Sequence, residues 1–461
     1  MFGAIAALVS AALFWFGTGL HPLWWLTWLA PLPALWYART ASWWAAALVA
    51  LAAWFIGGFN LWDYAHGLIG LPVPLILSFL AIPAVVFALA VLVWRREMRA
   101  ARVWRAVLLP ALVWVTFEYV QTITSPNGTF GSLAYTQMDC LPVVQIASLT
   151  GIYGVSFLIF LVPSALAMRR WQPIAAVAGA MAVVTGFGVE RLWSGATQHV
   201  HVALIASDAP QDRWAKNGTE ALAMLSRYAA QVETIRQGRI VVLPEDLGPV
   251  PNSAFSDARA ILSDAARQAG VELVVGLRVG QTPPLLNEAL VFRPDGTLQA
   301  VYEKHHLIPG IENGIVAGSQ VVTMPGRVGL QGTQICKDLD FPALSREYGR
   351  RGTGLLLVPA WDFNVDGWLH DRMAVMRGVE NGFAIARAAR NGLLTLSTSR
   401  GVVTLERATS PAGFVTAEGA IREDHTDTLY TRAGDWFAWV SIAVLVVLLA
   451  TRWRRHADLV R

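Results

Sequence analysis

Charged residues are scarce in this chain. Only 15% of its 461 residues are Asp, Glu, Lys or Arg, whereas 55% are hydrophobic, and the mean hydropathy is +0.46. This composition excludes an ordinary soluble globular protein and indicates segments that cross a membrane. The length is sufficient for two or more domains.

Cysteine is also scarce, with only Cys140 and Cys336 present. Two cysteines cannot form a disulfide framework, and their positions lack the spacing of metal ligands. The sequence has no P-loop and no G-x-G-x-x-G motif. The adjacent His305 and His306 would face opposite sides of a strand, so they cannot chelate one ion together. We therefore expect neither a metal ion nor an organic cofactor.

Only three of the 36 basic residues are lysines: Lys216, Lys304 and Lys337. A bias towards arginine codons explains this scarcity, but the two side chains differ in chemistry. An ammonium is a compact charge that can transfer a proton, whereas a guanidinium stays charged and planar. Lys337 directly follows Cys336 in "GTQICKDLDF". The question is whether this cysteine is a spare buried thiol or the nucleophile of an enzyme.

Long apolar runs occupy the first part of the chain and reappear at its end. Seven runs of membrane-spanning length lie near 2–20, 22–38, 42–62, 72–94, 104–122, 142–168 and 172–190, and an eighth covers 436–450. The segment between the seventh and eighth runs has mixed polarity. The sequence therefore predicts a seven-span α-helical membrane domain (1–192), a globular domain (193–432), and a last span with a basic tail (433–461).

The arginines between these runs predict the orientation of the spans. They gather after the second, fourth, sixth and last runs, at Arg39, Arg95, Arg96, Arg99, Arg102, Arg105, Arg169, Arg170, Arg452, Arg454, Arg455 and Arg461. Basic connections face the cytoplasm, so the N-terminus should lie inside and the globular domain outside. Because the basic charge flanks spans, it does not indicate a nucleic-acid partner.

Strand-like and helix-like pieces alternate between residues 199 and 408, which predicts an α/β layered domain. Three of the strands end in reactive side chains: Glu245 ends "VVLPE", Lys304 ends "LQAVYEK" and Cys336 ends "LQGTQIC". Open α/β sheets place catalytic groups at the carboxyl ends of strands. We therefore expect these three side chains to lie close together.

The three side chains together would suit acyl transfer through a thioester. Glu245 could take the thiol proton of Cys336, and the Lys304 ammonium could stabilise the oxyanion of a tetrahedral intermediate. Taken singly, each has a simpler interpretation, as a solvated glutamate, an exposed lysine and an inert buried cysteine. A disulfide between Cys140 and Cys336, both expected outside, is a further alternative.

The motifs "LPED", "EKHHLIPGIE" and "QICKDLDF", in that order, resemble the Glu–Lys–Cys triad of the nitrilase superfamily of carbon–nitrogen hydrolases. Seven spans before such a domain and one after it resemble a narrower family, the apolipoprotein N-acyltransferases. The segment "PALVWVTFEYV…LAYTQ…QIASLTGIYGVSFLIF" is similar to that family's fifth and sixth spans. The resemblance implies an external α-β-β-α sandwich in a multi-pass protein of the bacterial inner membrane, with the catalytic domain on the periplasmic side.

The resemblance also implies the reaction. Cys336 would take a fatty acyl chain from a phospholipid, and the N-terminal amine of a diacylglyceryl-cysteine lipoprotein would attack the thioester. The partners would be these two substrates and the bilayer, and we expect a monomer. The alternative is a membrane-anchored nitrilase-type amidase that uses water as acceptor. A non-catalytic membrane scaffold is a third interpretation, against which the presence of all three residues argues.

Further residues enter as supporting groups by their position in the motifs. Glu312 matches the family's second glutamate, which helps to orient the lysine. Asp338 stands where the acyltransferases usually have Glu, although it could instead cap the short helix that starts near Phe341.

Two positions depart from the family pattern. The segment after the lysine usually runs to Pro-Phe-Gly-Glu, and here it reads "PGIE". An aromatic residue usually follows the nucleophile, and here that position is Lys337. This lysine would either lower the pKa of the Cys336 thiol or point away into solvent.

Glu118 is a carboxylate deep in the fifth run, where we expect it to tie that span to a neighbour.

Overall fold

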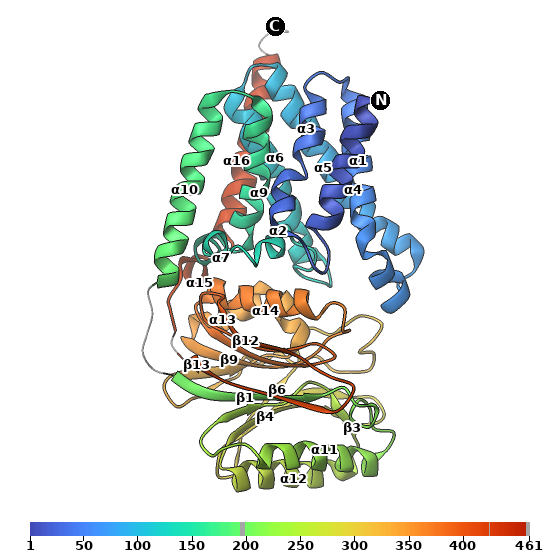
Figure 1. Cartoon of the computed structure of the whole chain (residues 1–461), viewed down its shortest axis with the longest axis vertical. Helices are drawn as coiled ribbons and strands as arrows, with labels where there is room; N and C mark the ends of the chain where they lie inside the picture. The colour runs from blue at the N-terminus through green and yellow to red at the C-terminus, as the bar shows by residue number, and fades with distance from the viewer. Residues whose placement is uncertain (194–198, 424, 458–461) are drawn as a thin grey trace. The chain divides into compact units, whose positions relative to one another are not determined.

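The computed structural model describes residues 1–193, 199–423 and 425–457 of the chain. These residues form two compact units, one of Met1–Trp193 with Ala433–Arg461 and one of Ser194–Arg432. The first unit is helical, and the second contains all the strands of the described chain (Figure 1).

The helical unit contains α1 (Phe2–Gly17), α2 (Trp24–Leu29), α3 (Leu32–Ala38), α4 (Trp43–Gly58), α5 (Val73–Arg99), α6 (Val103–Thr124), α7 (Leu141–Val144), α8 (Ala147–Thr150), α9 (Ile152–Met168), α10 (Trp171–Trp193) and α16 (Trp436–Ala457). Four helical stretches are long and apolar enough to cross a membrane: Trp43–Leu61, Val73–Arg99, Val103–Thr124 and Trp171–Trp193. Shorter apolar helices cover Phe2–Gly17, Leu141–Thr150, Ile152–Met168 and Trp436–Thr451.

Two of the predicted apolar runs are not single helices. The run 22–38 divides into α2 and α3, with Pro31 at the N-cap of α3, where its missing N–H costs the helix nothing. The run 142–168 is interrupted at Gly151, whose φ of +65° a residue with a side chain rarely adopts. Local backbone chemistry thus divides segments that hydropathy alone treats as continuous.

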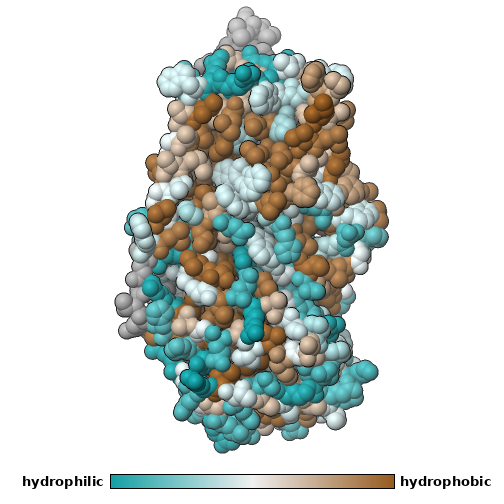
Figure 2. Space-filling view, in the orientation of Figure 1, coloured by the Kyte–Doolittle hydropathy of each residue, from teal (hydrophilic) through white to brown (hydrophobic). Residues whose placement is uncertain are grey.

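Aromatic rings fill the interior of the helical unit. The ring centroids of Trp54 lie 4.5 Å from those of both Phe14 and Trp114, and Trp114 lies 4.7 Å from Phe160. The outer face of the helical unit in Figure 2 is dominated by hydrophobic residues, as expected of helices that face lipid.

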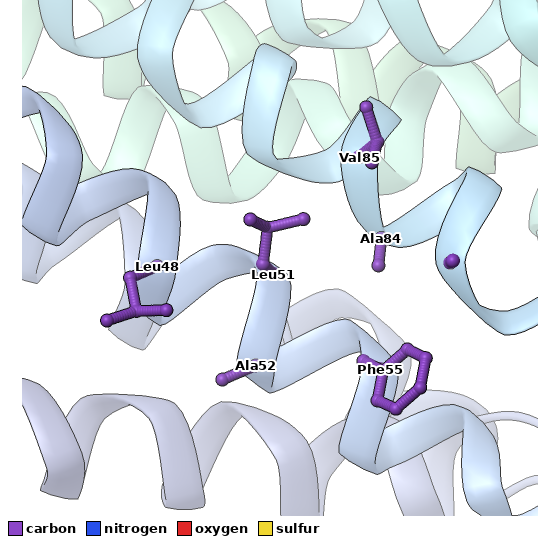
Figure 3. Close-up of a pocket in the computed structure, with 7 residues that line it drawn as sticks. Leu48, Leu51, Ala52, Phe55, Ala84 and Val85 are labelled. Atoms are coloured by element: carbon purple, nitrogen blue, oxygen red, sulfur yellow. The ribbon is translucent and has the colours of Figure 1, made fainter.

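An open apolar groove of about 260 Å³ lies on α4 and α5, between Leu48, Leu51, Ala52, Phe55, Ala81, Ala84 and Val85 (Figure 3).

Glu118 has a structural role within α6. Its carboxylate accepts hydrogen bonds from Trp114 Nε1 at 3.0 Å, from Ser132 Oγ at 3.1 Å and from the Leu133 backbone N–H at 2.9 Å. The side chain therefore ties α6 to the 3-10 turn η3 (Leu133–Gln137) in the connection that follows it. An acid in an apolar helix is tolerated because these donors satisfy it.

The second unit contains two sheets. Its elements are β1 (His199–Ser207), α11 (Gly218–Glu233), β2 (Ile240–Val242), β3 (Leu247–Val250), α12 (Phe255–Ala269), β4 (Glu272–Val279), β5 (Leu286–Phe292), β6 (Leu298–Glu303), β7 (Thr323–Pro325), β8 (Leu330–Thr333), the 3-10 turn η6 (Cys336–Asp340), α13 (Pro342–Arg350), β9 (Thr353–Trp361), α14 (Gly367–Asn381), β10 (Ala384–Arg390), β11 (Leu393–Ser397), β12 (Val403–Ala408) and β13 (Phe414–Arg422). One sheet has the order β13-β1-β2-β4-β5-β6, with β3 also paired to β4. The other has the order β12-β11-β10-β9-β8-β7.

The two sheets pack face to face between two layers of helices (Figure 1). One core joins α11 and α12 to the first sheet, a second core lies between the sheets, and a third joins α13 and α14 to the second sheet. Strands such as β9 are buried along almost their whole length, which explains their continuous apolar sequence. The layer order is therefore α-β-β-α, as the resemblance implied.

Candidate active site

The three predicted reactive side chains come from strand ends in both sheets. Glu245 lies just beyond β2 and Lys304 directly follows β6, both in the first sheet. Cys336 begins η6, just beyond β8 of the second sheet. The side chains are almost fully buried, with exposed fractions of 2%, 1% and 8% for Glu245, Lys304 and Cys336. The Glu245 N–H donates to the Ala360 carbonyl at 3.2 Å, which links the two sheets at this point.

Lys304 lies between two carboxylates. Its Nζ is 2.7 Å from Glu245 Oε1, and 3.0 and 2.9 Å from the two carboxylate oxygens of Glu312. Burial alone would lower the pKa of Lys304, but the two carboxylates outweigh it and raise this pKa well above its usual range. The lysine is therefore an ammonium, and Glu312 contacts it directly.

Asn287 on β5 completes this group, and the sequence did not single it out. Its Nδ2 donates to Glu245 Oε1 at 2.8 Å and to Glu312 Oε1 at 2.9 Å. One amide thus fixes both carboxylates that flank Lys304. The available signal was a polar residue inside the apolar strand "LNEALVF", which is too common to identify a site by itself.

Glu245 is a buried carboxylate with a raised pKa. Burial raises its pKa, and the Lys304 ammonium opposes that rise without cancelling it. A buried carboxylate with a raised pKa accepts a proton more readily than an exposed one does. The backbone of Glu245 lies so close to β4 that residue 276 must be a glycine. A Cβ on Gly276 would lie 2.6 Å from the Glu245 Cα.

Cys336 has a strained backbone and a protonated resting state. Its φ of +42° lies in the left-handed region, which costs a non-glycine residue about 1–3 kcal/mol. Its Sγ donates to the Trp361 carbonyl at 3.3 Å. Burial, followed by the negative charge of Glu245, raises the pKa of the thiol well above its usual range, although Lys304 acts to lower it. A thiol in this environment needs a base to remove its proton before it can act as a nucleophile.

Asp338 connects the turn that carries the cysteine to the segment that carries the lysine. Its Oδ1 accepts the backbone N–H groups of His305 and His306 at 3.1 and 2.8 Å, and its Oδ2 accepts the Tyr302 hydroxyl at 2.7 Å. The Ile335 N–H also donates to Oδ2, at 3.2 Å. The alternative that Asp338 caps the helix near Phe341 is wrong, because α13 has no side-chain cap.

Lys337 is buried, with 7% of its surface exposed, so the expectation that it could point into solvent is wrong. Its Nζ lies 3.5 Å from Asp340 Oδ2 in the same turn. A buried ammonium needs such a partner because the loss of hydration is costly. The disulfide alternative is also wrong, because Cys140 and Cys336 are both free thiols.

A second buried ion pair lies beside the thiol. Arg387 on β10 binds Asp362 through two hydrogen bonds, of 2.9 and 2.6 Å, and the charges of both residues act on the Cys336 thiol. Sequence reasoning missed this pair because its members are 25 residues apart on different elements. Among the residues that the structure describes, no group of three or more His, Cys, Asp or Glu side chains is arranged to hold a metal ion.

Comparison with known proteins relates both units to one family. The family described as "Apolipoprotein N-acyltransferase N-terminal domain" matches residues 10–165, and "Carbon-nitrogen hydrolase" matches residues 218–418. An apolipoprotein N-acyltransferase of Geobacter metallireducens is 30% identical, covering 83% of this chain and 80% of that protein. Another, from Haemophilus ducreyi, is 24% identical and covers 94% of both chains. Among solved structures, an amidase from Nesterenkonia sp. is 24% identical with a TM-score of 0.42, over 54% of this chain and 98% of that chain.

Proposed function

This chain belongs to the apolipoprotein N-acyltransferase family, and we propose that it transfers a fatty acyl chain from a phospholipid, through a thioester on Cys336, to the N-terminal amine of diacylglyceryl-cysteine lipoproteins. The observation that supports this most directly is the buried arrangement of Lys304 between Glu245 and Glu312, next to a strained cysteine. We propose Glu245, Lys304 and Cys336 as the catalytic residues.

In the first step, the Cys336 sulfur attacks the ester carbonyl of the phospholipid while Glu245 takes the thiol proton. The Lys304 ammonium stabilises the oxyanion of the tetrahedral intermediate. The carbon–oxygen bond then breaks, and the leaving lysophospholipid alkoxide takes the proton from Glu245. The products are a thioester on Cys336 and a lysophospholipid, with Glu245 ionised again.

In the second step, the lipoprotein amine attacks the thioester carbonyl and passes a proton to Glu245. Lys304 again stabilises the oxyanion, and the thiolate leaves and takes the proton that Glu245 received from the amine. The amide product is more stable than the thioester, so the step runs downhill. Burial of the site limits loss of the thioester to water.

The membrane arrangement that we propose follows from the sequence. Spans precede and follow the catalytic domain in the chain, eight in total, and the basic connections face the cytoplasm. The catalytic domain then faces the periplasmic side of the bacterial inner membrane, where both lipid substrates lie in the adjacent leaflet. We expect the protein to act as a monomer.

Incubation of the purified protein with phospholipid should produce an acyl adduct on Cys336 that hydroxylamine removes, detected by peptide mass spectrometry. Cys336→Ala should abolish the adduct, whereas Cys140→Ala, a matched control in the other unit, should leave it unchanged. The absence of an adduct on a free and reduced Cys336 would reject the thioester intermediate. Release of free fatty acid, without transfer to an added lipopeptide amine, would identify a hydrolase instead.

A further inference from the structure

The turn that carries Cys336 needs external support. A non-glycine residue in the left-handed region persists only where the surrounding structure holds it there. Asp338 fastens one side of η6 to the segment after Lys304. The other end of the turn is Asp340, which is 2% exposed and belongs to a second group of buried charges.

This second group joins η6 to the start of α14. His370, in the first turns of α14, has its Nδ1 3.9 Å from Asp340 Oδ1 and its Nε2 3.2 Å from Asp366 Oδ2. Asp366 is the N-cap residue of α14, and its Oδ1 accepts the Phe363 N–H at 2.8 Å. The imidazole therefore lies between a carboxylate on the nucleophile's turn and a carboxylate at the start of the helix.

Lys337 approaches the same carboxylate from within the turn. Its Nζ is 3.5 Å from Asp340 Oδ2 and 6.0 Å from the centre of the Phe341 ring. Asp340 thus has a cation on each of its two oxygens, one from η6 and one from α14. This arrangement accounts for a buried lysine next to the nucleophile without giving the lysine a role in the chemistry.

We propose that His370 is a positioning residue, whose imidazolium, held between Asp340 and Asp366, fixes the turn that carries Cys336 against the start of α14. The inference rests on the acyl-carrying role proposed above for Cys336. Without the cation, two buried carboxylates would face each other, and the turn would lose its ionic attachment to the helix. The thiol would then shift from the position in which Glu245 and Lys304 act on it.

The electrostatics agree with this geometry. Burial by itself lowers the pKa of His370, but Asp366, Asp340 and Asp362 outweigh it and raise this pKa from 6.5 to about 9. The other charged groups nearby are Lys337 on η6 and Arg387 on β10, each paired with one of these carboxylates. Because the folded pKa is raised, the attachment is complete below about pH 6.5 and is lost as the pH rises through about 9.

The test compares the intact protein with His370→Asn in two assays across this pH range. The first measures alkylation of Cys336 by iodoacetamide, resolved from Cys140 by peptide mass spectrometry, and the second measures thioester formation from phospholipid. At pH 7 we expect His370→Asn to slow both reactions by about tenfold to a hundredfold. The ratio of wild-type to variant rates should fall towards one as the pH passes about 9, because the wild type then loses its cation as well.

Two further variants make the result specific. Asp340→Asn removes one of the carboxylates that raise the pKa of His370. The imidazole of this variant should therefore lose its proton, and its effect on the rates, at a lower pH than in the wild type. His201→Asn, which changes an exposed histidine on β1, should match the wild type at every pH. A folded His370→Asn protein with wild-type rates, or a rate ratio independent of pH, would overturn the proposal. If Cys336 alkylation behaves as expected but no acyl adduct forms, the positioning role stands and the proposed function fails.

Discussion

Single residues at the site act by satisfying charges that cannot reach water, and Asn287 illustrates this. Its one amide donates to both Glu245 and Glu312, so Asn287→Leu would leave two buried carboxylates each short of a donor, at about 1–3 kcal/mol apiece. We expect thioester formation on Cys336 to slow by at least tenfold, measured by mass spectrometry of the acyl adduct. Asn252→Leu, at an exposed asparagine, serves as the matched control. An undiminished rate in Asn287→Leu would show that Lys304 and Glu312 orient Glu245 unaided.

At the scale of the elements, Asp338 joins η6 to β6 through Oδ2, which accepts the Tyr302 hydroxyl, and to the segment after β6 through Oδ1. Asp338→Asn keeps the shape but offers only one acceptor oxygen, so an NH₂ group would face donors on one side, at about 1–3 kcal/mol. We expect a lower Tm, by several degrees, together with slower acylation. Asp264→Asn breaks only an exposed ion pair with Arg267 and should change the Tm little. Equal Tm values for the two variants would contradict this role for Asp338.

At the scale of the whole molecule, the proposed membrane topology is testable in cells. In a variant without native cysteines, Asp139→Cys in the connection after α6 should react with a membrane-impermeant maleimide applied to the periplasmic side. Ala100→Cys, at the exposed end of α5 among the arginines, should react only after the membrane is opened. The reverse labelling pattern would invert the orientation and place the catalytic domain in the cytoplasm.

Much of the fold could be predicted because its signals are local. An apolar run or a strand that ends in a polar residue is visible over ten residues, and this was enough to single out Glu245, Lys304 and Cys336. Interruptions within runs were harder to predict, because Pro31 and Gly151 divide helices without changing the average hydropathy around them. The predicted number of eight spans stays a prediction, since four helical stretches in the described chain are long enough by themselves to cross a membrane.

The sequence by itself determined that this protein has apolar helices of a membrane protein, and it predicted how the basic connections are oriented and which three side chains are suited to acyl transfer. These properties depend on neighbouring residues alone. The free energy of transferring a segment into a membrane is a sum over its own residues, and strand periodicity is a pattern within a few residues. Only the tertiary structure decided that Asn287 fixes both carboxylates, that Lys337 is buried against Asp340, and that His370 joins η6 to α14. Those contacts depend on which strands and helices become neighbours, and that choice is made by the packing of two sheets and not by any short stretch of chain.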